Sequence, residues 1–189
     1  MKPSITAIFF DVGGTLRMSQ SGKRRNLNLI REIQAVIGDS SQPAEFAQAL
    51  HEREKEYRRW ARKTQRELNE HDLWARFMLP GAPEPFLREN AVLLNQMWRD
   101  SSSRQLLPDA VTTMRALAAR GYRLGIISNT TSSIEVPRLL RENDLTDLFK
   151  VVILSCVNGR RKPHPSLFLE ASRAVGLPPE NCAYLGDKT

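Results

Sequence analysis

The chain has 189 residues, 41% of them hydrophobic and 26% charged, with a formal net charge of +7 at pH 7. That length suits one domain, or one domain with an insertion. No stretch approaches the ~18 uninterrupted apolar residues of a membrane span, and the first apolar run is too short for a secretory signal, so the composition excludes a membrane-spanning protein and favours a cytoplasmic one.

The first predicted element is a buried strand over residues 5–11. This short apolar run ends at Asp11 and is followed at once by Gly13, Gly14 and Thr15. Ligands of open α/β sheets bind beyond the carboxyl ends of the strands, and glycines allow a tight turn whose N–H groups face an anion. A carboxylate beside such donors suits a nucleophile that forms an aspartyl-phosphate. An Asp that merely caps a strand-to-loop turn fits this stretch equally well.

A helical block is expected over residues 17–105. Apolar side chains recur there at helical spacing, and the block contains no convincing strand. The expected helices lie at about residues 27–37, from 43 onward, 73–78 and 86–98. We therefore predict an all-helical domain inserted between the first strand and the rest of the chain.

From residue 106 onward, the pattern changes to strands that alternate with helices. The expected strands are 123–128, 151–155 and 182–185, and the expected helices lie around 111–121, 134–142 and 165–175. This alternation is typical of βαβ units and a parallel sheet. Residues 1–16 and 106–189 are thus expected to form one discontinuous α/β domain.

Each strand of this second half is followed by polar residues that can meet Asp11. Ser128 and Asn129 offer a hydroxyl and backbone N–H groups to phosphoryl oxygens. Lys162 precedes a proline, which keeps it extended, and can place a positive charge beside a phosphate. Asp187 follows the last strand and adds a second carboxylate, the kind of ligand that Mg²⁺ prefers. Taken singly, these features also fit a helix cap, a solvated lysine and an ordinary turn.

Together, the order Asp, Ser, Lys-Pro and Gly-Asp resembles the haloacid dehalogenase-like hydrolase superfamily over the whole chain. The resemblance implies a Rossmann-like core with a helical cap, and Mg²⁺-dependent hydrolysis of a small phosphorylated metabolite. It implies that Asp11 is the nucleophile and that Lys162 neutralises charge on Asp11 and the phosphate. The implied substrate-binding residues are Ser128, Asn129, Gly14 and Thr15, and the implied metal ligands are Asp11, Asp187 and the backbone carbonyl of Gly13.

Two departures from the family pattern leave alternatives open. Family phosphatases usually carry a second Asp at the position of Gly13 as general acid and base, a group that contributes ~10²–10⁴-fold to catalysis. A weakly active or non-catalytic phosphate- or partner-binding protein therefore stays open, as does a relative that cleaves a non-ester bond. The family also continues beyond Asp187 with a further acid, a strand and a helix, so we expect a truncated chain with an incomplete core and metal site.

The positive charge raises a third hypothesis, a basic nucleic-acid-binding module. Residues 52–66 hold seven Lys or Arg side chains, together with Tyr57 and Trp60. At helical spacing these aromatic rings are more typical of a cap core, and the charge is diffuse, so a nucleic acid is the less favoured partner.

Cys156 and Cys182 are expected to be small buried side chains, and the sequence does not predict an oligomeric state.

Overall fold

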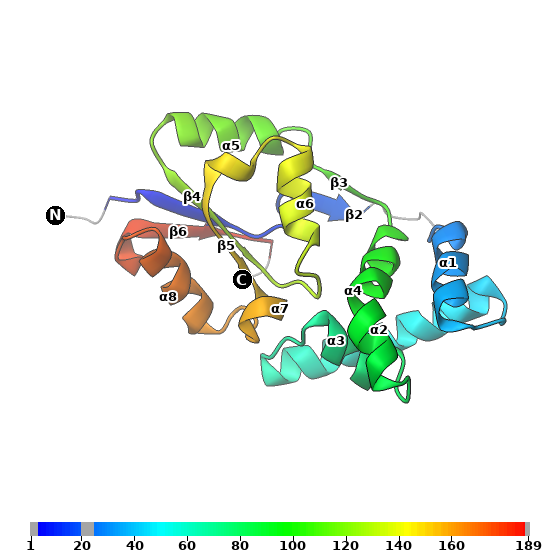
Figure 1. The fold of residues 1–189 in the computed structure, drawn as a ribbon. Helices are drawn as coiled ribbons and strands as arrows, with labels where there is room; N and C mark the ends of the chain where they lie inside the picture. The colour runs from blue at the N-terminus through cyan, green and yellow to red at the C-terminus, as the bar shows by residue number, and fades with distance from the viewer. Residues whose placement is uncertain (1–3, 20–24, 188–189) are drawn as a thin grey trace.

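The computed structural model describes residues 4–19 and 25–187, and it confirms the predicted parallel sheet. The four strands lie in the order β5-β4-β1-β6 (Figure 1). Their bounds are Ala7–Phe10 for β1, Arg123–Ser128 for β4, Phe149–Leu154 for β5 and Cys182–Leu185 for β6. All neighbouring pairs are parallel, so the carboxyl ends of the strands share one edge of the sheet.

Helices cover both faces of this sheet (Figure 1). Side chains along a strand point alternately to opposite faces. Ile8 and Phe10 of β1 pack in one cluster with α5 (Ala110–Ala119) and α6 (Glu135–Glu142). Ala7 and Phe9 pack on the other face against α8 (Pro165–Ala174). All four side chains are buried, which explains why this strand reads as a continuous apolar run.

The inserted block forms a separate group of helices with its own apolar core (Figure 1). It consists of α1 (Leu27–Ile37), α2 (Pro43–Thr64), α3 (Glu70–Leu73), the π-helical turn η1 (Trp74–Met78) and α4 (Glu84–Asp100). Their apolar faces meet around large, fully buried side chains such as Leu50, Trp74 and Leu94. These helices make up the block that the resemblance assigns to a cap, and the block contacts the core at Arg160 and Ser133.

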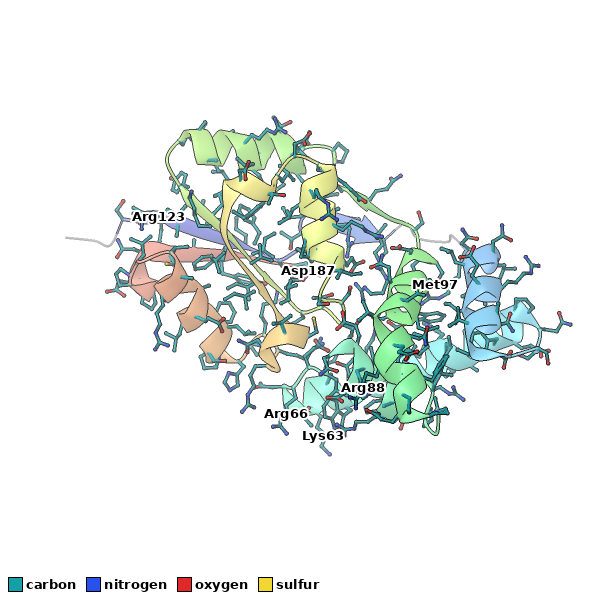
Figure 2. The ribbon with its side chains drawn as sticks, viewed as in Figure 1. Lys63, Arg66, Arg88, Met97, Arg123 and Asp187 are labelled. Atoms are coloured by element: carbon teal, nitrogen blue, oxygen red, sulfur yellow. The ribbon has the colours of Figure 1, made fainter. Side chains whose placement is uncertain are left out.

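The aromatic residues of the basic stretch 52–66 face this cap core. The Tyr57 ring is fully buried and stacks with Trp60, and both rings contact Phe77. Figure 2 labels Lys63 and Arg66 near the C-terminal end of α2, where Arg66 forms a β-bridge with Arg160 of the core. The Tyr57 and Trp60 rings are therefore used for packing within the cap.

The expectation of an all-helical insertion is wrong at both of its ends. Strands β2 (Arg17–Ser19) and β3 (Arg104–Leu106) form an antiparallel ribbon where the chain leaves and re-enters the α/β domain. Three residues are too few to show a period of two, and the pairing joins segments far apart in sequence. The short helix α7 (Ser155–Asn158) and the 3₁₀ turns η2 (Thr146–Leu148) and η3 (Pro179–Asn181) were not expected either.

The two cysteines, the end of β5 and the membrane-span prediction complete the comparison of sequence with structure. Cys156 is buried as expected, but Cys182 is only partly buried, and both are free thiols. Ser155 opens α7 and does not end the preceding strand. Within the described ranges, no helix has the length and apolar character to cross a membrane.

Candidate active site

Asp11 lies at the carboxyl edge of the sheet, directly after β1. Its backbone N–H donates to the carbonyl of Leu185 at 2.8 Å, which extends the pairing of β1 with β6. Its carboxylate oxygen Oδ1 accepts the N–H of Val12 at 2.7 Å and lies 2.9 Å from Nζ of Lys162. The exposed fractions of the Asp11 and Lys162 side chains are 15% and 9%, so this ion pair is sheltered but open on one side.

Lys162 reaches Asp11 from the loop between α7 and α8. Its ammonium group also donates to the carbonyl of Ile127 at 2.7 Å and to the hydroxyl of Tyr184. Burial lowers the pKa of Lys162, while the negative charges of Asp11 and Asp187 act in the opposite direction. Both carboxylates therefore lie close enough to Lys162 to stabilise its positive charge, although they follow different strands.

Tyr184 of β6 is a member of this cluster that the sequence did not reveal. Its hydroxyl accepts from Lys162 and hydrogen-bonds to Asp11, and its ring packs edge-on against Phe168 with centroids 5.2 Å apart. Burial and the charges of Asp11 and Asp187 raise the pKa of Tyr184, so the hydroxyl keeps its proton and can donate it to Asp11. In the sequence, Tyr184 is one residue of an apolar strand, and no local pattern marks it.

Ser128 ends β4, the strand that pairs in parallel with β1, and Asn129 follows it. Ser128 is the last residue of β4 and is buried. The Asn129 side chain bonds the backbone of Lys162 twice: Oδ1 accepts its N–H at 2.8 Å and Nδ2 donates to its carbonyl at 3.1 Å. This residue was expected to act through its backbone alone, whereas its side chain fixes the loop that carries Lys162.

Asp187 lies against Gly14, in the turn that follows β1. Gly14 has a φ of +81°, and a Cβ built there would lie 2.4 Å from Oδ2 of Asp187, so only glycine fits. Thr15, the next residue, has a buried Oγ1 with no hydrogen-bond partner among the described residues. Buried hydroxyls are nearly always paired, so an oxygen-rich ligand in this turn would complete the hydrogen bonding of Thr15.

The oxygen donors here fit Mg²⁺ in number and kind. The described residues contain no group of three or more His, Cys, Asp or Glu side chains that could hold a metal. Mg²⁺ needs fewer protein ligands than such a group supplies, because it keeps several waters and binds through one or two carboxylates plus substrate phosphates. Asp11 and Asp187 supply two carboxylates near one point, and Gly13 can add a carbonyl. Figure 2 shows Asp187 on the cap side of the molecule, whereas Arg123 lies at the opposite end of the sheet.

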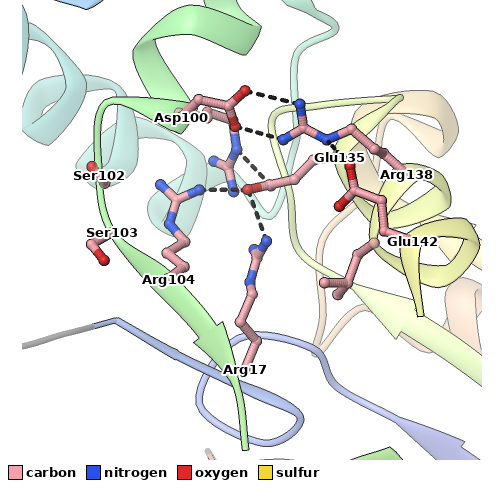
Figure 3. Close-up of a pocket in the computed structure, with 10 residues that line it drawn as sticks. Arg17, Asp100, Ser102, Ser103, Arg104, Glu135, Arg138 and Glu142 are labelled. Carbon is pink, nitrogen blue, oxygen red and sulfur yellow. Dashed lines mark hydrogen bonds and ion pairs between the residues drawn. The ribbon is translucent and has the colours of Figure 1, made fainter. Parts of the chain in front are cut away.

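A polar cavity of about 320 Å³ lies at the hinge between cap and core (Figure 3). Glu135 of α6 is its centre, and three arginines donate to it: Arg17 of β2, Arg104 of β3 and Arg99 of α4. Burial would raise the pKa of Glu135, but the three guanidinium groups lower it to about 2. The carboxylate therefore stays ionised and ties both ribbon strands to the core. None of the predicted site residues lines this cavity.

The chain is similar to known proteins in both sequence and fold. The chain matches the haloacid dehalogenase-like hydrolase family over residues 5–189. It is 30% identical over 188 residues to the glyceraldehyde 3-phosphate phosphatase of Methanopyrus kandleri. This match covers 97% of this chain and 76% of that protein. It is also 30% identical over 112 residues to the phosphoglycolate phosphatase of Nitrosococcus oceani, covering 58% of this chain and about half, 49%, of that relative. A crystal structure from Haemophilus somnus, described as a predicted phosphoglycolate phosphatase, shares the fold with a TM-score of 0.57 at 18% identity, covering 97% of this chain and 77% of that one.

Proposed function

The chain belongs to the haloacid dehalogenase-like hydrolases, and we propose that it is a Mg²⁺-dependent phosphatase that acts on a small phosphorylated metabolite through an aspartyl-phosphate at Asp11. The observation that carries this proposal is the contact between Asp11 and Lys162 at 2.9 Å. This contact supports the proposal because it joins a carboxylate, the proposed nucleophile, to a positive charge at the edge of the sheet where ligands of such folds bind.

The proposed reaction has two steps. The carboxylate of Asp11 attacks the phosphorus atom, and the bond from phosphorus to the leaving-group oxygen breaks as the aspartyl-phosphate forms. Water then attacks that intermediate, which releases inorganic phosphate and restores the carboxylate. Ser128 and the Thr15 N–H would hold the phosphoryl oxygens during both steps, whereas the Gly14 N–H already donates to the carbonyl of Arg17 at 2.9 Å.

Charge neutralisation is the main contribution that we assign to the other site residues. The phosphoryl group and Asp11 are both negative, so their approach requires a nearby cation. Lys162 supplies one such charge, and Tyr184 holds both Lys162 and Asp11 by its hydroxyl. When bound by Asp11, Asp187 and the Gly13 carbonyl, Mg²⁺ would supply further positive charge at the phosphate.

A test of this proposal is a substrate panel assayed with and without Mg²⁺. We expect release of inorganic phosphate from one or more of glyceraldehyde 3-phosphate, phosphoglycolate and 4-nitrophenyl phosphate, with activity lost when the metal is removed by EDTA and regained on adding Mg²⁺. The first two compounds are chosen from the names of the relatives. Full activity after removal of all divalent metal would contradict the proposed role of Asp187.

The hydroxyl of Tyr184 gives a second, narrower prediction. Tyr184→Phe keeps the ring on Phe168 but removes the hydroxyl that bonds Lys162 and Asp11. Hydrogen bonds to charged groups contribute ~1.5–3 kcal/mol, so we expect kcat to fall about tenfold or more at nearly unchanged thermal stability. Tyr122→Phe, a change on a partly buried tyrosine outside the site, is the matched control. An unchanged kcat in the folded Tyr184→Phe variant would show that the hydroxyl has no part in the reaction.

A further inference from the structure

A short segment of the cap, residues 65–67, pairs directly with the loop that carries Lys162. Helix α2 ends at Thr64, and Gln65 adopts a φ of 52°, a left-handed conformation that is uncommon for a residue other than glycine. The N–H of Arg161 then donates to the carbonyl of Gln65 at 3.0 Å, and the N–H of Glu67 donates to the carbonyl of Gly159 at 3.2 Å. These two bonds form an antiparallel bridge between cap and core.

The side chain of Glu67 enters the core at this bridge and is completely buried, with an exposed fraction of 0%. Its carboxylate accepts hydrogen bonds from Arg161, from the hydroxyl of Tyr57 and from Oγ of Ser155 at 2.7 Å. A buried carboxylate without partners would be strongly destabilising. The three donors satisfy it, and they come from the cap helix α2 and from two separate segments of the core.

Through these partners, Glu67 is connected to both loops beside Asp11. Arg161 is adjacent to Lys162 in the chain. Oγ of Ser155 accepts the N–H of Thr130 at 2.9 Å, and Thr130 follows Ser128 and Asn129 in the β4 loop. The two loops are also bonded to each other, because the side chain of Asn129 holds the backbone of Lys162.

We propose that Glu67 is a positioning residue, supplied by the cap, which holds the Lys162 loop and the Ser128–Thr130 loop in the arrangement that the reaction at Asp11 requires. Glu67 has no contact with Asp11 itself, so it acts through Arg161 and Ser155. The core site is then correctly arranged only while this cap segment is seated against it. This inference rests on the proposed function, because that function gives Lys162 and Ser128 their roles.

The activity of each folded molecule distinguishes this proposal from a buried ion pair that only stabilises the fold. A purely structural role would lower the fraction of folded protein and leave each folded molecule fully competent. A positioning role lowers the competence of every folded molecule, since a displacement of ~1 Å at a reacting centre costs up to ~10²-fold in rate.

The test compares Glu67→Gln, which keeps the shape but removes the charge, with Glu56→Gln, a change at an exposed glutamate of the preceding cap helix α2. Three quantities are measured: kcat on 4-nitrophenyl phosphate, the stoichiometry and Kd of orthovanadate binding with Mg²⁺, and amide hydrogen exchange in residues 128–131 and 159–164. For Glu67→Gln we expect kcat to fall between about 10-fold and 100-fold. We also expect the vanadate Kd to rise by a similar factor at unchanged stoichiometry, and faster exchange in both loops. Glu56→Gln should match the wild type in all three.

Two results would overturn the proposal. One is an unchanged kcat and vanadate Kd in folded Glu67→Gln, and the other is a reduced vanadate stoichiometry with an unchanged Kd, as expected for partial unfolding alone. If Glu67→Gln does not fold, Arg161→Gln breaks the same link while Tyr57 and Ser155 still bond Glu67, and the same criteria apply. If the wild type neither turns over substrate nor binds vanadate, the proposed function fails, and the exchange rates then decide by themselves whether Glu67 holds the two loops.

Discussion

Asp11→Asn is expected to reduce phosphate release by at least about 10⁴-fold, because the amide is not a nucleophile toward phosphorus. The substitution preserves the shape of the side chain and keeps an oxygen that can accept from Val12 N–H and Lys162 Nζ. Lys162 also retains its bonds to Ile127 and Tyr184. The fold should therefore survive, which circular dichroism and a cooperative thermal transition would check.

The matched control for this variant is Asp147→Asn, at an exposed aspartate of η2 away from the sheet edge. It should leave turnover unchanged. Should Asp11→Asn retain turnover on 4-nitrophenyl phosphate, another group must attack phosphorus, and the assignment of Asp11 is wrong.

Gly13→Asp is expected to raise hydrolysis of alkyl phosphates by about 10²-fold or more. The position of Gly13 lacks the general acid that protonates the leaving group in related phosphatases, and such a group contributes ~10²–10⁴-fold. Unlike Gly14, Gly13 does not have a positive φ, and a Cβ built there meets nothing within 4 Å. The turn can therefore accept an aspartate without strain. An aryl phosphate has a good leaving group that needs little protonation, so its hydrolysis should rise much less.

Gly13→Asn provides the control for shape, since it fills the same space without a transferable proton. Rates with alkyl and aryl phosphates are compared for the wild type and the two variants under saturating Mg²⁺. An equal gain for both classes of substrate, or an equal gain from Asn and Asp, would show that proton transfer to the leaving group is not what limits this chain.

The elements with a strong local pattern were predictable from the sequence. Helix α1 runs over Leu27–Ile37 and is capped by Gly38, as its apolar spacing and its glycine indicate. Strands β1 and β4 are apolar runs with turn residues at their ends, and the structure places them as neighbours. The residues after these strands are also predictable as a set, because parallel strands bring their carboxyl ends to one edge.

What the sequence did not reveal depends on contacts between distant residues. The ribbon of β2 and β3 exists only because its two strands meet across the whole cap. Tyr184 reaches Lys162 by its place in the sheet, and Glu67 reaches Arg161 by the docking of the cap on the core. A single sequence carries no periodicity for such pairs, since each is fixed by tertiary packing and not by its neighbours in the chain.

The central place of β1 in the sheet has a consequence for how this protein is made. Both partners of β1 lie more than a hundred residues further along the chain, whereas the cap closes its core within its own helices. At ~5–20 residues per second, the ribosome needs about ten seconds after finishing β1 before β4 emerges. During that interval the four apolar side chains of β1 have no sheet to join, so the strand that leads to Asp11 is synthesised first and is covered only after β4 has followed. Until β4 follows, this apolar segment stays exposed to other chains, and exposed apolar surface of this kind is prone to aggregation.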